Sequence, residues 1–242
     1  MFIGGIVGKI MNNMTIIYYT ANLISDIFAS NIRRHLLRTI GDKYSIISIS
    51  QKPIIDFGEN ICVGEIGVSG YNIYKQILLG SKMAKTEFIV CCEDDSLYIP
   101  EHFQYLPSKD TFAYNINRWN VNRRFYFYRA RQGMCMCVAP TELMIKTLEI
   151  RFSKFGEEWS KQKQIQYFGE PGRYERKLGL PPVKIESFRT ELPTLTFNHR
   201  PSYGGVRALL STDLIAEELP FWGNANNLWN NMMYGNGEIR EK

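Results

Sequence analysis

Three consecutive acids, Glu93, Asp94 and Asp95, stand directly after the apolar run 88–92 in the stretch CCEDDSLYIPEHF. Carboxylates gathered at the end of a strand repel one another unless a divalent cation neutralises them, and oxygen ligands suit Mg²⁺ or Mn²⁺. The alternative is a solvated loop in which the acids serve as N-caps for a helix at PEHF, residues 100–103. The strand pattern before the acids favours the metal site.

A second stretch with chemical character is RWNVNRRFYFYRARQG, residues 118–133, which holds five arginines, five aromatic residues and no acid. Guanidinium groups match phosphates and aromatic faces stack on bases, so this interleaving suits a nucleic-acid surface. A β-hairpin explains it equally well, with its aromatic side chains in the core and its arginines in water or against a bound diphosphate. The sequence alone leaves both interpretations open.

The elements around the acids must position them, and the first hundred residues alternate between strand and helix patterns. β-Branched and aromatic residues predict strands at 15–20, 44–50 and 86–92. Apolar residues at helical spacing predict one helix that begins at Ser25 or Asp26 and another over 71–84. This alternation favours a mostly parallel sheet with helices on both faces, and ligands bind such sheets beyond the carboxyl ends of the strands. The acids lie at that edge.

Composition favours one compact unit. The chain has 242 residues, of which 45% are hydrophobic, so we expect a single domain. Its formal net charge of +5 permits an anionic partner but lacks the excess of a polybasic tail. Four of the five cysteines lie in apolar runs and no C-x-x-C pair occurs, which predicts free thiols in a reducing cytosol. The apolar start FIGGIVGKIM is too short to span a bilayer, and we expect residues 1–13 to be flexible.

The order of segments from TIIYYTAN through YSIISISQKP and GVSGYNIYKQILLGSKMAKTEFIV to CCEDDSLYIPEHF resembles the GT-A superfamily of nucleotide-sugar glycosyltransferases. The resemblance implies a single-domain, Rossmann-like α/β fold, with a donor-binding half over 14–100 and an acceptor-side half over 101–242. It also implies that acids of a D-x-D-type motif hold a divalent metal, which bridges the two phosphates of a donor such as a UDP-sugar. This sequence reads E-D-D in place of D-x-D, which leaves the division of ligands among the three acids open.

The resemblance further implies roles for individual residues. Asp95, Glu93 and His199 would bind Mn²⁺ or Mg²⁺, and the softer imidazole ligand favours Mn²⁺. Glu170, or Glu175 a few residues later, would be the general base on the acceptor hydroxyl, because FGEPGRYERKLGL resembles the segment that carries this acid in inverting members. Donor contacts are expected from the strand ends and the following helix: Thr20, Ala21, Asn22, Gln51, Lys52, Asn72, Lys75, Gln76, Glu93 and Asp94.

The stretch from SISQKP to CEDDSLYIPEHF is also similar to phage and metagenomic GT-A proteins, some of which glycosylate 5-hydroxymethylpyrimidines in DNA. We therefore expect a metal-dependent glycosyltransferase that uses a nucleotide sugar. Its expected location is the cytoplasm, which would be that of a bacterial host if the protein is phage-encoded. Its favoured acceptor is 5-hydroxymethylcytosine in DNA, and a surface glycan or a protein is the alternative. The alternative outside the enzymes is a non-catalytic module that binds nucleic acid.

Overall fold

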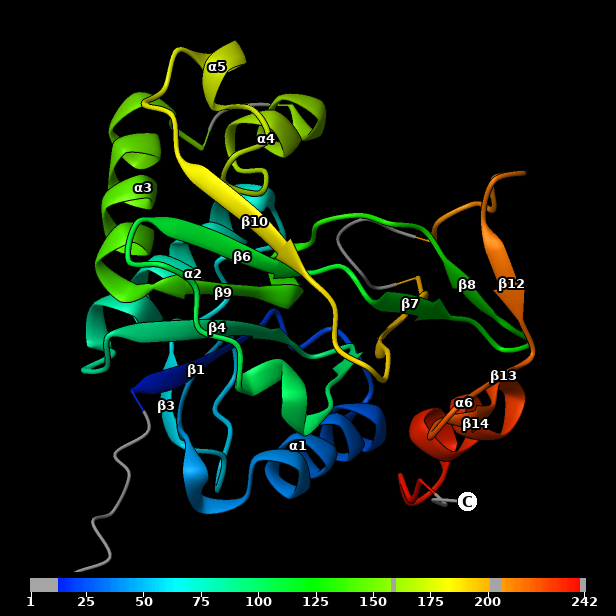
Figure 1. The fold of residues 1–242 in the computed structure, drawn as a ribbon. Coiled ribbons are helices and arrows are strands. Elements are labelled where there is room, and N and C mark those ends of the chain that lie inside the picture. Colours follow the sequence, from blue (N-terminus) through cyan, green and yellow to red (C-terminus); the bar gives the residue numbers. More distant parts are fainter. Residues whose placement is uncertain (1–12, 158–159, 201–205, 240–242) are drawn as a thin grey trace, which may run out of the picture.

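The computed structural model describes residues 13–157, 160–200 and 206–239. Its largest element is a seven-stranded sheet in the order β10-β6-β9-β4-β1-β2-β3 (Figure 1). The strands are β1 (Met14–Thr20), β2 (Ser45–Ser50), β3 (Glu59–Cys62), β4 (Phe88–Glu93), β6 (Thr111–Asn115), β9 (Cys137–Pro140) and β10 (Lys184–Phe188). β9 runs antiparallel between β4 and β6, and the other neighbours pair in parallel. The sheet is therefore mostly parallel.

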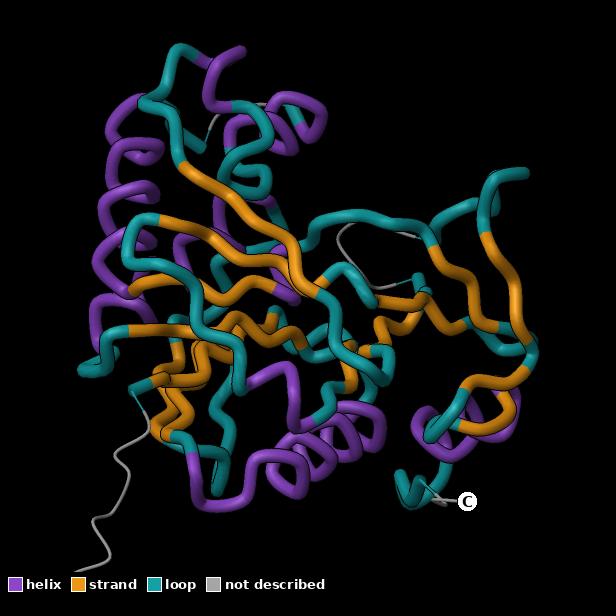
Figure 2. Tube along the Cα trace, in the orientation of Figure 1, coloured by secondary structure: helices purple, strands orange, loops and turns teal. Residues whose placement is uncertain are grey.

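Helices cover both faces of this sheet. α1 (Asp26–Ile40) lies on one face, and α2 (Gly70–Met83) and α3 (Thr141–Lys154) lie on the other (Figures 1 and 2). Side chains alternate along a strand, so neighbouring residues of β1 serve different helices. Tyr18 lies in one hydrophobic cluster with Leu36 of α1. Ile17 lies in another cluster with Ile77 of α2. The predicted α/β fold, with a mostly parallel sheet between two helical layers, is confirmed.

Short sequence signals determine how α1 and α2 begin and how closely α2 packs. The Ser25 side chain accepts a hydrogen bond from the Phe28 backbone N at 3.3 Å, which caps α1 as predicted. Ser69 does the same for α2, where the Asn72 backbone N is the donor at 3.0 Å. A Cβ at Gly80 would lie 2.7 Å from Cγ2 of Ile17, so glycine allows α2 to approach β1 closely.

A second sheet of five strands has the order β12-β8-β7-β11-β5 and extends from the end of the first (Figure 2). Its strands are β5 (Ser96–Leu97), β7 (Arg118–Val121), β8 (Tyr126–Tyr128), β11 (Thr194–Phe197) and β12 (Leu214–Ala216). β4 ends at Glu93 and β5 begins at Ser96. The chain therefore passes from the first sheet to the second through Asp94 and Asp95.

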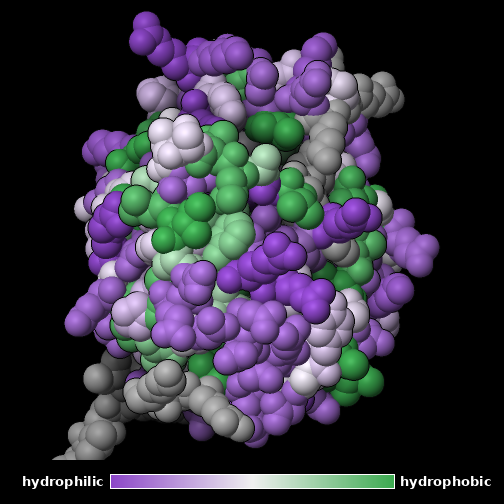
Figure 3. Space-filling model, turned by 90° about the vertical axis from the view of Figure 1, so that its right-hand side faces the viewer, coloured by the Kyte–Doolittle hydropathy of each residue, from purple (hydrophilic) through white to green (hydrophobic). Residues whose placement is uncertain are grey.

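The outer end of the second sheet is an apolar edge. Figure 3 shows the right-hand side of Figure 1, where β8 and β12 lie. Hydrophobic side chains interrupt a largely hydrophilic surface on this side. β12 is the edge strand, and its Leu214 and Ile215 are 60% and 56% exposed.

The remaining elements are short, apart from the C-terminal helix. They are η1 (Gly41–Lys43), η2 (Pro100–Phe103), η3 (Met134–Met136), α4 (Lys161–Tyr167), α5 (Glu175–Leu178), β13 (Glu218–Leu219), β14 (Gly223–Asn224) and α6 (Ala225–Tyr234). α6 is held against α1 by the buried Asn31, whose Nδ2 donates to the carbonyl oxygens of Met232 and Gly235. Within the described ranges, no helix is both long and apolar enough to cross a bilayer. The predicted flexible start, residues 1–13, lies outside the described residues except for Asn13.

Candidate active site

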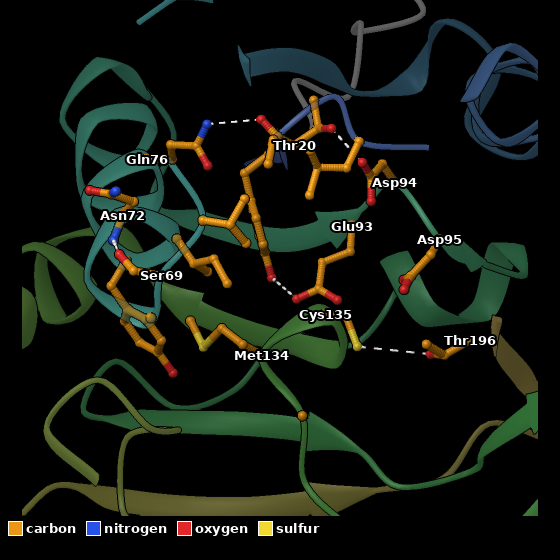
Figure 4. Close-up of a pocket in the computed structure, with 18 of the residues that line it drawn as sticks. Thr20, Ser69, Asn72, Gln76, Glu93, Asp94, Asp95, Met134, Cys135 and Thr196 are labelled. Carbon is orange, nitrogen blue, oxygen red and sulfur yellow. Dashed lines mark hydrogen bonds between the residues drawn. The ribbon is translucent and has the colours of Figure 1, made fainter. Parts of the chain in front are cut away.

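A cavity of about 400 Å³ opens where the two sheets meet, at the carboxyl ends of β1 and β4 (Figure 4). Residues from the end of β1, the start of α2 and the acidic triplet line one side of it. Residues from β7, β11 and the segment before β9 line the other side. This is the edge at which open α/β sheets bind ligands, and the position agrees with the sequence-based expectation for the acids.

The three acids of the triplet point in different directions (Figure 4), and each has a different partner. Glu93 Oε1 accepts a hydrogen bond from the Tyr19 hydroxyl at 2.7 Å. Asp94 accepts one from the Thr20 hydroxyl. Asp95 Oδ2 lies 3.2 Å from His199 Nε2. The interpretation of these acids as helix caps is wrong, because Ile99 precedes η2 and no side chain caps that helix.

The surroundings of the triplet disfavour the ionised forms of two of its three carboxyls. Burial, followed by repulsion from Asp95, raises the pKa of Glu93 to about 8, although the hydrogen bond from Tyr19 opposes this shift. Burial and the same neighbour raise the pKa of Asp94 to about 6. Carboxylates whose ionised forms are disfavoured in this way would be stabilised by a cation. The chemistry of the cluster therefore fits a divalent metal ion.

The structure brings together two of the three residues that the sequence suggested as metal ligands. Asp95 and His199, which are 104 positions apart in the chain, are both buried and in contact. Glu93 faces Tyr19 instead. Among the residues that the structure describes, no group of three or more histidine, cysteine, aspartate and glutamate side chains is arranged to hold a metal. A metal held by Asp95 and His199 alone would have its remaining coordination positions filled by water or by a substrate oxygen.

The predicted donor-binding residues divide into two groups. Thr20, Ala21, Gln51, Asn72, Gln76, Glu93 and Asp94 line the cavity, and Asn22, Lys52 and Lys75 do not. Lys52 and Lys75 are exposed. Asn22, with φ of 54°, accepts hydrogen bonds at Oδ1 from the backbone N of Gln51 at 2.8 Å and of Lys52 at 2.9 Å. Asn22 therefore ties the end of β1 to the end of β2.

Buried amides shape the cavity wall between β1 and α2. Gln76 Nε2 donates to the Thr20 carbonyl oxygen at 3.0 Å. Gln51 pairs with Gly67 through both ends of its amide, since Nε2 donates to Gly67 O at 2.7 Å and Oε1 accepts from Gly67 N at 3.1 Å. These bonds fix the strand ends and the loop before α2 in one arrangement. The loop residues 67–70 also line the cavity, and the sequence analysis did not assign them to the site.

The two candidate general bases have different surroundings. Glu170 lines the cavity, and its Oε2 is 3.0 Å from Arg173 Nη1. Glu175 is not among the lining residues, and its carboxylate pairs with Arg151, which is completely buried. Glu175 also accepts hydrogen bonds from the backbone N of Gly172 at 2.7 Å and of Tyr174 at 3.2 Å. Glu175 thus holds α5 in place, and only Glu170 is positioned for chemistry in the cavity.

The stretch 118–133 forms the β-hairpin that was one of its two interpretations. β7 and β8 pair antiparallel, Tyr126 lies in the hydrophobic cluster with Leu195, and Phe127 is also buried. Arg123 and Arg124 are exposed between the strands. Arg129 pairs with Asp213, at 2.7 Å from Nε to Oδ1. The aromatic residues of this stretch thus belong largely to the two strands, and Arg123 and Arg124 to the turn between them.

Three arginines line the cavity on the side of the second sheet: Arg118 and Arg131, which lie in the stretch 118–133 noted from the sequence, and Arg207, which the sequence did not indicate. Arg118 belongs to β7, Arg131 to the segment after β8, and Arg207 to the chain after β11. Only their position in the folded chain unites them, because 89 positions separate Arg118 from Arg207 in the sequence. The site therefore has an acidic wall from the first sheet and a basic wall from the second.

Comparisons with known proteins identify the fold. No protein-family model matches the sequence, and no curated protein matches it. Residues 1–349 of TarS from S. aureus, solved in complex with UDP-GlcNAc, match with a TM-score of 0.50 and 13% sequence identity over 78% of this chain; the chain spans 60% of that structure. A glycosyltransferase involved in glycosylation of the major capsid of PBCV-1 matches with a TM-score of 0.45 and 8% identity, over 76% of this chain and 91% of that one. The mixed α/β fold is thus shared with a protein that holds a nucleotide sugar.

Proposed function

We propose that this protein is a glycosyltransferase that moves a sugar from a nucleotide-sugar donor to a hydroxyl of an acceptor. The observation that carries the proposal is the contact of Asp95 with His199 beside a cavity at the carboxyl end of β4. An aspartate and an imidazole at such an edge suit a metal that binds a diphosphate. The fold supports the proposal, because TarS shares it and was solved with UDP-GlcNAc.

The donor would bind on the side of the cavity formed by β1, β2 and α2. Thr20, Ala21, Gln51, Asn72 and Gln76 present backbone and amide groups there, and such groups recognise a nucleotide base and ribose through hydrogen bonds. Asn22, Lys52 and Lys75 would act from outside the cavity, Asn22 by holding the strand ends together. We assign Glu93 and Asp94 to the edge where the nucleotide meets the diphosphate.

A metal ion, Mn²⁺ or Mg²⁺, would be held by Asp95 and His199. Bound there, it would supply stabilisation of the negative charge that develops on the departing diphosphate. Burial and repulsion from Asp95 raise the pKa of Glu93 and of Asp94, so a cation beside Asp95 would favour the ionised forms of both carboxyls. The imidazole ligand favours Mn²⁺ over Mg²⁺.

Glu170 is our candidate for the general base. Its carboxylate lies at the cavity and is oriented by Arg173, at 3.0 Å from Oε2 to Nη1. A base in this position would accept the proton of the acceptor hydroxyl as the oxygen attacks the anomeric carbon, while the bond from that carbon to the donor diphosphate breaks. Donor and acceptor would thus meet between the acidic triplet and Glu170.

The acceptor favoured by the sequence, 5-hydroxymethylcytosine in DNA, stays a prediction. The exposed Arg123 and Arg124 at the turn of the hairpin offer cations for a phosphate backbone. A DNA acceptor requires that the target base leave the stack to reach the cavity. A surface glycan or a protein hydroxyl would avoid that requirement and would make activity less sensitive to salt.

Donor hydrolysis tests the enzymatic proposal directly. The protein is incubated with a panel of nucleotide sugars and Mn²⁺, and the released nucleoside diphosphate is measured. Asp95→Asn should lower release from the accepted donor at least about a hundredfold, since a metal contributes several kcal/mol of charge stabilisation and each 1.4 kcal/mol is a factor of ten in rate. Asp42→Asn, an exposed aspartate in η1, is the matched control and should leave the rate unchanged.

Two outcomes of this assay would contradict the proposal. Full activity of Asp95→Asn would remove Asp95 from the site. Binding of nucleic acid without release of nucleoside diphosphate from any donor would favour the non-catalytic nucleic-acid-binding module. The acceptor is tested by adding DNA with 5-hydroxymethylcytosine, digesting it to nucleosides and weighing them, and an unmodified nucleoside with every donor would exclude this acceptor.

A further inference from the structure

The basic wall of the cavity contains a guanidinium group with unsatisfied hydrogen-bonding capacity. Arg118 is 3% exposed, although its residue type is almost always exposed or paired with an acid. Its Nη1 donates to Cys135 Sγ at 3.4 Å, which is a weak acceptor. Its Nε has no hydrogen-bond partner and is buried. Glu93 and Glu170 act on this guanidinium electrostatically, but a buried N–H donor without a hydrogen-bond partner is costly, and it points to a missing anionic ligand.

The fold makes room for this guanidinium and fixes a second one beside it. A Cβ at Gly133 would lie 2.4 Å from Arg118 Nη1, so glycine at this position keeps the space that the side chain occupies. Arg207 Nη1 donates to Asn120 Oδ1 at 3.0 Å, and its backbone N donates to Asn198 Oδ1 at 2.8 Å. These contacts position both charges at the cavity before any ligand binds.

Two of the three arginines, Arg131 and Arg207, are disfavoured as cations by burial and by neighbouring arginines. Burial acts in the same direction on Arg118, but Cys135, Glu93 and Glu170 raise the pKa of Arg118. Burial, followed by repulsion from Arg118 and Arg131, lowers the pKa of Arg207. Burial also lowers the pKa of Arg131, where Glu170 opposes the shift and Arg173 and Arg118 add to it. Like charges gathered around one cavity are stabilised by a shared counter-ion. Guanidinium groups match the geometry of phosphate oxygens, and they do so with paired hydrogen bonds.

We propose that Arg118, Arg131 and Arg207 form a binding site for a phosphate group of the acceptor, distinct from the place of the donor diphosphate. The assignment to the acceptor rests on the proposed function, in which Glu170 accepts the proton of the acceptor hydroxyl. Arg131 lies within electrostatic reach of Glu170, so an anion at this wall is next to the attacking oxygen. The acceptor is then a phosphorylated molecule rather than a neutral sugar or polypeptide.

The two walls of the cavity have different origins in the fold. Glu93, Asp94 and Asp95 come from the end of β4 in the first sheet, whereas the three arginines come from β7 and from segments that follow strands of the second sheet. The walls are close enough for Arg118 to interact electrostatically with Glu93, and Arg207 with Asp95. A donor diphosphate beside Asp95 and His199 would have the metal as its counter-charge, which would leave the arginines to a second anion. The rival assignment gives the arginines to the donor diphosphate itself, and the two assignments differ in whether both anions bind together.

Inorganic phosphate is the probe that tests the site without turnover. Its binding to the full chain is measured by isothermal titration calorimetry in EDTA, and then with UDP and Mg²⁺ at saturating concentrations. Arg131→Gln and Arg207→Gln should each weaken phosphate binding at least about tenfold, because each removes a charge-assisted hydrogen bond. Arg38→Gln and Lys85→Gln, which are exposed and do not line the cavity, are the controls and should bind as the wild type does.

A third variant perturbs the site without removing a charge. Gly133→Ala places a methyl group where the Arg118 guanidinium lies, and it should also weaken phosphate binding. We expect the wild type to bind phosphate with equal affinity in the presence of UDP and Mg²⁺. Displacement of phosphate by UDP would overturn the proposal and assign the arginines to the donor.

Two further results would also overturn it: no phosphate binding by the wild type, or equal binding by Arg131→Gln, Arg207→Gln and the controls. These outcomes are distinguishable from a failure of the proposed function. A protein that binds phosphate through the three arginines but releases no nucleoside diphosphate from any donor would retain the anion site and lose the glycosyltransferase assignment. In that case the bound phosphate would not belong to a sugar acceptor, and the acceptor part of the proposal would fall with the function.

Discussion

Replacing Glu175 by glutamine should unfold the protein more easily without touching the cavity. The Arg151 side chain is completely buried, and its Nη2 donates to Glu175 Oε1 while its Nη1 donates to the Gly169 carbonyl oxygen. Glutamine keeps the shape of the side chain but removes the negative charge. Arg151 would then be a buried cation without a counter-ion among the described residues that contact it, and breaking a buried pair in this way costs about 3–5 kcal/mol.

The expected shift in melting temperature follows from the size of the chain. One kcal/mol corresponds to about 2–4 °C for a domain of this length, so Glu175→Gln should melt about 6–20 °C below the wild type. Circular dichroism at 222 nm on heating, together with urea unfolding, measures this difference. Glu170→Gln is the matched control, because its partner Arg173 is 35% exposed and such surface pairs contribute at most about 1 kcal/mol.

The same pair of variants separates a structural carboxylate from a catalytic one. Glu170→Gln should keep its melting temperature and lose glycosyl transfer, whereas Glu175→Gln should lose stability and keep its rate at temperatures where it is folded. If the melting temperature of Glu175→Gln lies within about 2 °C of the wild type, the loss is at most about 1 kcal/mol. Such a result would refute the reasoning about the buried pair. If it melts normally and is inactive, Glu175 returns as a candidate base.

Three further changes test the packing. Gly80→Ala should cost about 1–3 kcal/mol in urea unfolding, because the new methyl group meets Ile17 at 2.7 Å. Asn31→Ala should cost about 1–3 kcal/mol and speed hydrogen exchange in α6, since it removes the bonds to the end of that helix. Acid should remove the stability that two buried histidines provide: burial lowers the pKa of His35 to about 4 and of His102 to about 3, and both titrate near 6.5 when unfolded. This contribution is complete above about pH 6.5 and is lost as the pH falls toward 4, whereas Glu93 and Asp94, whose pKa values are raised, stabilise the fold over the same range. The histidine contribution is therefore measured against His35→Gln, and the difference in urea midpoint between the wild type and this variant should shrink from about pH 7 to about pH 5.

Three strands of the first sheet could be predicted because their signals are local. β1 and β4 occupy largely apolar runs, β2 alternates between serine and isoleucine, and the cap Ser25 stands next to the helix it begins. The position of the acids then follows from the end of β4. The contact of Asp95 with His199 had no such local signal, and only the resemblance to a family indicated it before the geometry placed the two side chains together.

Of the second sheet, only the β7–β8 hairpin was among the interpretations of the sequence, because the strands are two to four residues long and most pairings join distant segments. β11 pairs with both β5 and β7, and neither pairing leaves a pattern in the sequence. Arg118 and Arg131 meet Arg207 only because of these pairings. The sequence therefore indicated the acidic wall of the site and two arginines of the basic wall, but not that the two walls face one cavity.

The way the two sheets are joined argues that the donor and acceptor halves, 14–100 and 101–242, act as one unit. β9 of the second half lies between β4 and β6 in the first sheet, and β11 pairs with β5, which follows the acids directly. The backbone N of Phe197 donates to the Asp95 carbonyl oxygen at 2.8 Å, so the same contact aligns Asp95 with the strand that leads to His199. A cut at residue 100 would expose an edge of β4 and remove His199, Glu170 and the basic wall together. A donor half expressed alone should therefore neither fold stably nor hold a metal, because the second half supplies both the strand that covers β4 and the imidazole beside Asp95.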